Sequence, residues 1–317
     1  MYKSKDLQKL VPKLREKGYY IPKQQRNIDW SSYTYNQIND IINSLQFIRD
    51  EVDKFHQKRI HNSVGRPPID AGNLAKAILL AELFGLPERK AEGLIKLIGH
   101  HAGIDENIDD RVLGEAYKRL DVINILENIF EENKSSDGEN GGDGTGLEKS
   151  RKENYESTKK KNLYMTSIVD SREIVQAFDI SSKQECKIMR YLVKHLHKSV
   201  KKLTGKLTLD AGFIDRKLTQ LISDSGLEPY IFPKKNQLLK SKGYPAWNKM
   251  WLKLLKDVQG WLKEYHIRSH TESFHSSFKR IFGIVTKLCY KATYTQILCR
   301  IIHNNRRKLN YFSMAII

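Results

Sequence analysis

Four residues near the C-terminal end of the chain have types and a spacing that could support chemistry on a phosphate. They follow the pattern Tyr265-x2-Arg268-x3-Glu272-x6-Lys279, in which Tyr265, Glu272 and Lys279 recur every seven residues. On a helix such positions share one face, and Arg268 lies one turn before the glutamate on the same side. One helix face therefore presents a carboxylate flanked by two cations and a phenol. This arrangement suits a metal ion that must meet a phosphate.

The pattern lies in a stretch that contains no proline, and this stretch is predicted to form one long helix, Trp247–Gly283. Apolar residues recur on the side of this helix that faces away from the glutamate, so we expect that side to pack on a core. These residues are Ile267, Phe274, Phe278 and Ile281.

Asp210 follows the short predicted strand 207–210 and precedes Ala-Gly. On a strand, Leu207 and Leu209 point to one face, whereas Thr208 and Asp210 point to the other. Open α/β sheets hold their ligands at the C-terminal ends of strands, which favours a functional aspartate. A turn or helix-cap aspartate explains the residue equally well.

Asp143 lies in the sequence Asp-Gly-Thr-Gly, within a Gly-rich polar junction that spans residues 134–146. Asp-Gly is an ordinary turn signal, and the residues before Asp143 make a poor strand. A site built on Glu272 and Asp210 would nevertheless need a third oxygen ligand. Three carboxylates can hold two Mg²⁺ or Mn²⁺ ions and still leave positions for water and phosphate oxygens. Two such ions activate an attacking oxygen and stabilise the leaving one.

The charge of the chain points to a polyanionic partner. The 317 residues include 55 Lys or Arg and 37 Asp or Glu, a net charge of +18. Residues 233–310 alone carry 17 Lys or Arg and 3 Asp or Glu. A basic surface concentrated in this way favours nucleic acid as the partner, with an acidic lipid surface or simple solubility as the alternatives.

The remaining composition indicates a cytoplasmic protein. The three cysteines, Cys186, Cys289 and Cys299, have no metal-binding spacing and are predicted to be core thiols. The N-terminal residues contain no apolar run typical of a signal peptide. The longest apolar stretch, 75–86, is too short to cross a bilayer, so we expect no membrane partner.

Two regions with different periodicity are predicted. Residues 1–133 are expected to form an all-helical region, with helices over 35–61, 73–84, 88–97 and 110–130, which is compatible with either a DNA-binding helix-turn-helix module or a plain helical bundle. Residues 134–317 are expected to form an α/β domain. Its hairpin, 163–169 and 174–180, precedes helix 183–203, strand 207–210, helix 215–225, strand 230–232, the long helix and a last helix, 294–309. With one more strand before the hairpin, this is the ribonuclease H order, a mixed sheet flanked by helices.

The three acidic motifs together resemble those of DDE transposases of bacterial and archaeal insertion sequences. The pattern around Glu272 matches that family's Tyr-x2-Arg-x3-Glu-x6-Lys signature at every spacing. Two other segments fit the resemblance, which covers roughly residues 60–310. They are Gly-Arg-Pro-Pro at 65–68 and Pro-Lys-Lys-Asn at 233–236.

The resemblance implies a metal-dependent enzyme that cleaves the ends of a transposon and joins them to target DNA. Asp143, Asp210 and Glu272 would be the catalytic triad and would hold two Mg²⁺ or Mn²⁺ ions. Double-stranded DNA would be the partner, and a homodimer is expected in the DNA complex because two ends must be joined. The residues implied to contact DNA are Tyr265, Arg268, Lys279, Arg280, Lys234 and Lys235.

The chain departs from the family pattern in two ways. The poor strand before Asp143 suggests a displaced first strand or an inactive copy. Only 62 residues separate Asp210 from Glu272, which leaves no room for a large insertion. In this segment Trp247 and Trp251 could stack on a base or pack the start of the helix. Two alternatives to a transposase remain: an inactive relative that still binds DNA, and a ribonuclease H-like nuclease that cuts without joining.

Overall fold

The computed structural model describes residues 2–16, 19, 28–56, 68–148, 163–182, 185–196 and 201–315. The chain forms two compact units, each built from segments that are far apart in the sequence. Unit 1 comprises residues 1–27, 135–146 and 163–277, and unit 2 comprises residues 28–134, 147–162 and 278–317. The division into an all-helical region, 1–133, and an α/β catalytic domain, 134–317, stays a prediction. Residues 65–67 of the Gly-Arg-Pro-Pro segment lie outside the described residues.

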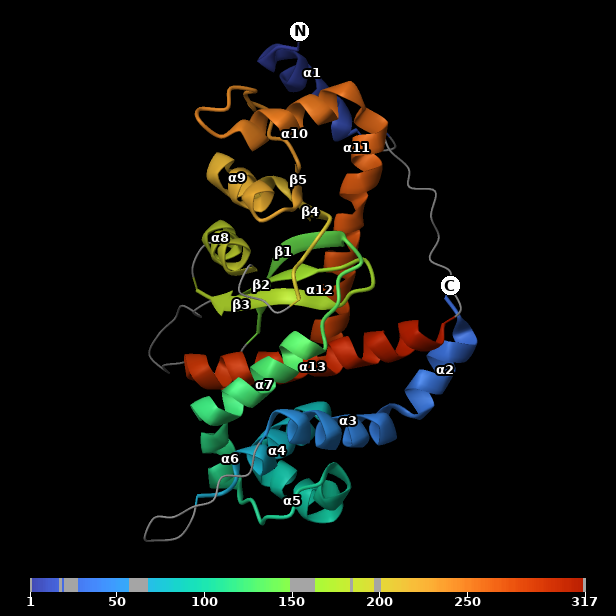
Figure 1. Ribbon diagram of the computed structural model, residues 1–317, viewed down its shortest axis with the longest axis vertical. Helices are drawn as coiled ribbons and strands as arrows, with labels where there is room; N and C mark the ends of the chain where they lie inside the picture. The colour runs from blue at the N-terminus through green and yellow to red at the C-terminus, as the bar shows by residue number, and fades with distance from the viewer. Residues whose placement is uncertain are drawn as a thin grey trace. The chain divides into compact units, whose positions relative to one another are not determined.

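A five-stranded mixed sheet with the order β3-β2-β1-β4-β5 forms the centre of unit 1 (Figure 1). Its strands are β1 Glu139–Leu147, β2 Leu163–Val169, β3 Val175–Ser181, β4 Lys206–Leu209 and β5 Glu228–Ile231. β2 and β3 form the predicted antiparallel hairpin, while β1, β4 and β5 run parallel. The ribonuclease H-like class predicted from the sequence is confirmed, with β1 as the additional strand before the hairpin.

Helices cover both faces of this sheet. Those of unit 1 are α1 Ser4–Leu14, α8 Glu185–His195, α9 Arg216–Asp224, α10 Pro245–Lys256 and α11 Val258–Tyr265. The short turns η3 Ala211–Phe213 and η4 His266–Arg268 lie beside them, and α12 Ser269–Phe282 begins in this unit. Figure 1 shows α8 and α9 on one side of the strands and α11 with the start of α12 on the other. Asp215 caps α9 as predicted, since its Oδ1 accepts a hydrogen bond from Leu218 N at 2.7 Å.

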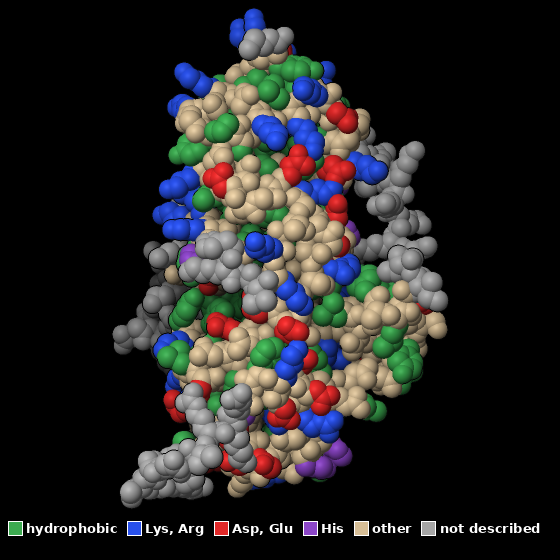
Figure 2. All heavy atoms as spheres, viewed as in Figure 1, with side chains coloured by type: hydrophobic (Ala, Val, Ile, Leu, Met, Phe, Trp, Pro, Cys, Tyr) green, Lys and Arg blue, Asp and Glu red, His purple; other side chains and the backbone are tan. Residues whose placement is uncertain are grey.

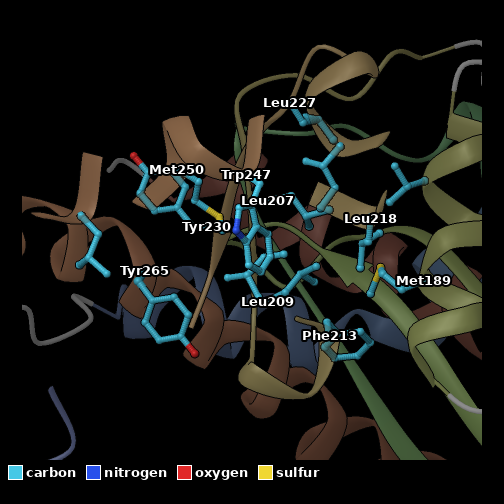
Figure 3. Close-up of a cluster of buried hydrophobic side chains, with 14 of the residues drawn as sticks. Met189, Leu207, Leu209, Phe213, Leu218, Leu227, Tyr230, Trp247, Met250 and Tyr265 are labelled. Carbon is cyan, nitrogen blue, oxygen red and sulfur yellow. The ribbon is translucent and has the colours of Figure 1, made fainter. Parts of the chain in front are cut away.

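The core of unit 1 forms between β4, β5 and the helices (Figure 3). Leu207 and Leu209 of β4 are fully buried in it, and so are the side chains of Trp247 and Trp251. The Trp247 ring is held by a hydrogen bond from Nε1 to Leu238 O, 2.9 Å long. The two tryptophans therefore pack the start of α10, as one of the two readings of the sequence proposed. α1 also contributes Leu7 to this cluster, so a helix near the start of the chain shares one core with segments as distant as Tyr265.

Unit 2 is helical. Its elements are α2 Trp30–Ile38, α3 Asp40–Phe55, α4 Ala71–Leu83, α5 Glu88–Ile98, η1 Gly99–Ala102, α6 Asp110–Ala116, α7 Leu120–Glu132 and α13 Tyr290–Met314. α4 is buried along almost its whole length and packs against α3, α7 and α13. Inside this bundle, Glu82 of α4 accepts hydrogen bonds from Arg300 Nε at 2.8 Å and from Tyr117 Oη at 2.8 Å. The buried charge is thus paired and hydrogen-bonded, which is the condition for tolerating it in a core.

Two predictions of a long helix, made from the periodicity of apolar residues, are wrong. In each case the helix is interrupted at a polar residue. The predicted helix Trp247–Gly283 is divided into α10, α11, η4 and α12. At the first break Asp257 adopts an extended backbone and its Oδ1 accepts a hydrogen bond from Gly260 N, which starts a new helix. The predicted helix 35–61 is likewise divided, between α2 and α3 at Asn39. Among the described residues, no helix is both long enough and apolar enough to span a bilayer.

Candidate active site

β1 carries Asp143 and is a regular strand in spite of its composition. It pairs in parallel with β4 over four residues, from Glu139 opposite Lys206 to Gly142 opposite Leu209. The expectation of a distorted or displaced first strand is therefore wrong. The physical reason is that glycine lowers the intrinsic preference for a strand but does not prevent pairing.

Gly141 and Gly142 of β1 are required because helices approach the strand closely on both faces. A Cβ added to Gly141 would collide with Thr271 Oγ1, which belongs to the first turn of α12. A Cβ on Gly142 would lie 2.7 Å from Met189 Cε of α8, on the other face. Glycine at a strand position often marks such a close approach. The glycines that suggested a weak strand thus allow α12 to lie close against the sheet.

Asp143 and Asp210 follow neighbouring positions on two paired strands, at the point where the pairing of β1 with β4 ends. The last pair of the β1–β4 ladder is Gly142 with Leu209, and each aspartate is the next residue in its strand direction. Neighbouring strands are about 5 Å apart, so the two aspartates begin from adjacent backbones. Asp210 also caps η3, because its Oδ1 accepts a hydrogen bond from Gly212 N at 2.7 Å. The residue therefore combines the cap role and the position at the strand end that the sequence left as alternatives.

Glu272 lies in the first turn of α12, on the side that faces away from the buried residues Thr271, Phe274 and His275. His275 Nε2 is 2.9 Å from Ser167 Oγ of β2, and this hydrogen bond attaches the helix to the sheet. The predicted burial of Phe274 is confirmed.

The predicted apolar stripe of this helix is only partly buried. Phe278 is buried, whereas Ile267 is half-buried and Ile281 is exposed. The expected burial of Ile281 is wrong: in the last turn of α12 the buried side chain is that of the next residue, Phe282.

Arg268 connects two of the predicted catalytic carboxylates. Its Nη2 donates to Glu272 Oε1 at 2.5 Å, and its Nη1 lies 3.4 Å from Asp143 Oδ2. The exposed fraction of the side chain is 20% for Arg268, 19% for Asp143 and 56% for Glu272, so the pair inside the site is more shielded than the glutamate. The guanidinium group thus supplies positive charge between Asp143 and Glu272.

The positive charge of Arg268 does not fully offset the effect of burial and of the neighbouring negative charges on Asp143. Burial, together with repulsion from Asp210 and Glu185, raises the pKa of Asp143 to about 6, even though the Gly144 N–H and Arg268 act to lower it. One pKa unit corresponds to about 1.4 kcal/mol, so an ionised Asp143 is unfavourable here. A carboxyl group with a strongly perturbed pKa is typical of a functional site.

Tyr265 is largely buried instead of lining an open surface. Its ring stacks on Trp261, with centroids 5.3 Å apart and an angle of 9° between the planes. Burial raises the pKa of Tyr265 to about 12, so the phenol stays protonated at neutral pH. The phenol nevertheless belongs to the site, because the charges of Arg268, Asp210 and Glu272 all act on it.

Glu185 is a fourth carboxylate at the site, and sequence reasoning missed it. This first residue of α8 packs so closely on β1 that a Cβ on Gly144 would overlap its carboxyl group. Burial raises its pKa, and so does repulsion from Asp210. No motif marks Glu185, and the available signal was only an acidic residue at the start of a helix that follows the hairpin.

The other predicted DNA-contacting residues are exposed cations. Lys234 and Lys235 follow β5 and Pro233, and Lys279 and Arg280 lie on α12 two turns after Glu272. Their contacts with DNA stay predictions.

The donor set suits a divalent cation in its chemistry. Within the described part of the chain, no three Asp, Glu, His or Cys side chains are already arranged as a metal site. The residues at this point are nevertheless carboxylates from three separate elements, and carboxylate oxygens are the ligands that Mg²⁺ and Mn²⁺ prefer. Arg268 stands between two of them as a cation. Asp143, Asp210 and Glu272 therefore fit the metal if the guanidinium group moves aside.

The sheet is ribonuclease H-like, with one aspartate within β1, a second directly after β4, and a glutamate on a following helix. The comparison with protein families agrees with this class. Residues 139–301, just over half of the chain, match the transposase DDE domain, and residues 22–97 match a transposase domain (DUF772). The chain belongs to the DDE transposase family, and the predicted resemblance is confirmed. No curated protein matches the chain.

Proposed function

We propose that this protein cleaves DNA at the ends of an insertion sequence and joins the freed ends to target DNA. The observation that carries the proposal is that Arg268 contacts both Asp143 and Glu272, while Asp210 directly follows the strand that pairs with the strand of Asp143. Members of the family generally use a divalent metal, and these three carboxylates are the proposed ligands.

Both proposed steps are in-line displacements at phosphorus. In cleavage, water attacks the phosphate at the element's end, a P–O bond forms, and the bond to the 3′-oxygen breaks to leave a 3′-hydroxyl. In joining, that 3′-hydroxyl attacks a target phosphate and releases the target's own 3′-hydroxyl. Two bound Mg²⁺ or Mn²⁺ ions would supply activation of the attacking oxygen and stabilisation of the leaving one.

Arg268 is proposed to contact carboxylates in the absence of DNA and a phosphate group when DNA is bound. Without DNA it holds Glu272 and approaches Asp143, as the structure has it. A guanidinium group binds phosphate as well as carboxylate through parallel N–H donors. We infer that a DNA phosphate takes Arg268 away from the carboxylates, which frees them for the cations.

The exposed Lys and Arg side chains would position the DNA backbone. Lys234, Lys235, Lys279 and Arg280 are exposed in the structure, and phosphate contacts of this kind hold DNA without reading its sequence. Protonated Tyr265 can donate a hydrogen bond at the same site. Base-specific recognition of the ends would come from other contacts.

The decisive experiment is a cleavage and joining assay on DNA that carries the sequences flanking the gene, with Mg²⁺. We expect Glu272→Gln to abolish both products, because it removes a ligand charge while keeping the shape of the side chain. Glu115→Gln, at an exposed glutamate of α6, is the matched control and should retain activity. Full activity of Glu272→Gln would refute the mechanism.

The same assay distinguishes the alternatives. An inactive relative was suggested by the poor strand before Asp143, and the regular β1 removes that motive. Such a protein would bind DNA in a salt-dependent way without cutting it under any divalent metal. A nuclease would give cut ends but no joined products.

A further inference from the structure

α2 exposes its large apolar side chains, and its one buried residue, Asn36, is polar. Trp30 and Ile38 are 67% and 75% exposed, whereas Asn36 is buried and its Nδ2 donates to Arg307 O at 3.0 Å. This is the reverse of an ordinary surface helix, whose apolar stripe faces the core. Polar contacts hold α2 to its own unit, and its apolar side is left for another surface.

The exposed apolar surface continues into the first turn of α3. Within residues 28–42 seven large apolar side chains are exposed, each by roughly half or more; they are Ile28, Trp30, Tyr33, Tyr35, Ile38, Ile41 and Ile42. We call this set the α2 face, and Figure 2 shows hydrophobic side chains gathered in the region of α2. At about 200 Å² for a large side chain, the α2 face exposes on the order of 700 Å². A specific protein–protein interface buries about 800 Å² per partner.

The α2 face carries little charge, although the chain as a whole is strongly basic. Residues 28–48 contain no Lys or Arg, in a chain of net charge +18. The two acidic residues of this stretch are engaged. Asp29 caps α2 by accepting from Ser31 N at 3.0 Å, and Asp40 pairs with Arg307 at 2.8 Å. A surface without cations does not suit DNA, whose binding depends on them.

We propose that the α2 face is the surface through which two copies of this chain form a dimer. Two molecules of charge +18 repel each other over most of their surfaces, and an uncharged apolar face is where that repulsion is weakest. Its estimated area matches one side of a stable interface. A dimer with two-fold symmetry brings the same face of both copies together, so no other complementary surface is needed. The dimer needs no DNA, and its test is independent of the proposed reaction.

The test is the oligomeric state of the full chain without DNA, measured by sedimentation over a wide range of concentration. We expect a reversible dimer, and we expect the double variant Trp30→Ser with Ile38→Ser to weaken it by at least about tenfold, since buried aromatic anchors dominate interfaces. The control is the double variant Leu97→Ser with Leu120→Ser. These two leucines lie in unit 2 and are 71% and 61% exposed, but they are outside the α2 face. Far-UV circular dichroism checks that all forms are folded.

Tryptophan fluorescence gives a second readout on the unmodified protein. Of the four tryptophans, Trp247, Trp251 and Trp261 are buried, so quenching by acrylamide reports mainly on Trp30. The quenching should decrease as concentration rises and the dimer forms. A chain that stays monomeric at all concentrations, or a dimer that the α2-face variant does not weaken, would overturn the proposal.

Discussion

Replacing Asp143 by asparagine should stabilise the metal-free protein at neutral pH. Burial and two neighbouring carboxylates raise the pKa of this group from 3.8 to about 6. The carboxyl group therefore binds its proton more tightly in the folded than in the unfolded chain. A difference of about two pKa units corresponds to roughly 3 kcal/mol of stability lost when Asp143 ionises. Asparagine avoids this cost and can keep the hydrogen bond that Oδ1 accepts from Gly144 N.

The pH dependence of this effect has a definite sign. Below pH 3.8 the carboxyl group is protonated in both states, and the wild type loses nothing. As pH rises from 3.8 to about 6, the unfolded state releases its proton before the folded state does, so the wild type becomes progressively less stable. The advantage of Asp143→Asn should thus be near zero below about pH 3 and should approach about 3 kcal/mol above pH 7.

Urea unfolding in the presence of EDTA, followed by tryptophan fluorescence, measures this difference. Three of the four tryptophans are buried in unit 1, which holds Asp143, so the signal reports on that unit. Adding Mg²⁺ should then stabilise the wild type more than Asp143→Asn, because a ligand that binds only the folded state adds to its stability. Asp170→Asn is the control for the Mg²⁺ effect: Asp170 is also buried with a pKa of about 6, but it pairs with Arg172. If Asp143→Asn is no more stable than the wild type at pH 7.5, the electrostatic account of the site is refuted.

Two further substitutions test how the site is assembled. Gly141→Ala should destabilise unit 1 by about 1–3 kcal/mol and abolish cleavage, because the added methyl group collides with Thr271 and pushes α12 from β1. Gly146→Ala, where a methyl group meets open space, should leave cleavage unchanged; equal loss in both variants would contradict the close-approach argument. Glu185→Gln should raise the Mg²⁺ concentration needed for half-maximal cleavage several-fold while leaving the rate at saturating Mg²⁺ within about twofold, since it removes negative charge next to Asp143 and Asp210 but no proposed ligand. An unchanged Mg²⁺ requirement would exclude Glu185 from the electrostatics of the site.

The sequence by itself indicated the family, because the spacing around Glu272 is a local pattern that can be recognised without knowledge of the fold. It also predicted the hairpin and the cap of α9, which depend on turn and cap chemistry within a few residues. Local patterns of this kind do not require knowledge of distant contacts. They did not reveal the breaks at Asp257, whose side chain caps α11, and at Asn39, whose Nδ2 donates to Tyr35 O at the end of α2.

The tertiary structure decided the features that depend on packing between distant segments. Gly141 and Gly142 looked unsuitable for a strand, yet their missing side chains let α8 and α12 approach β1 from both faces. Glu185 became part of the site only because α8 packs there. The contact of Arg268 with two carboxylates joins residues 125 positions apart in the sequence. Such arrangements follow from the free energy of packing the whole unit, which no local spacing encodes.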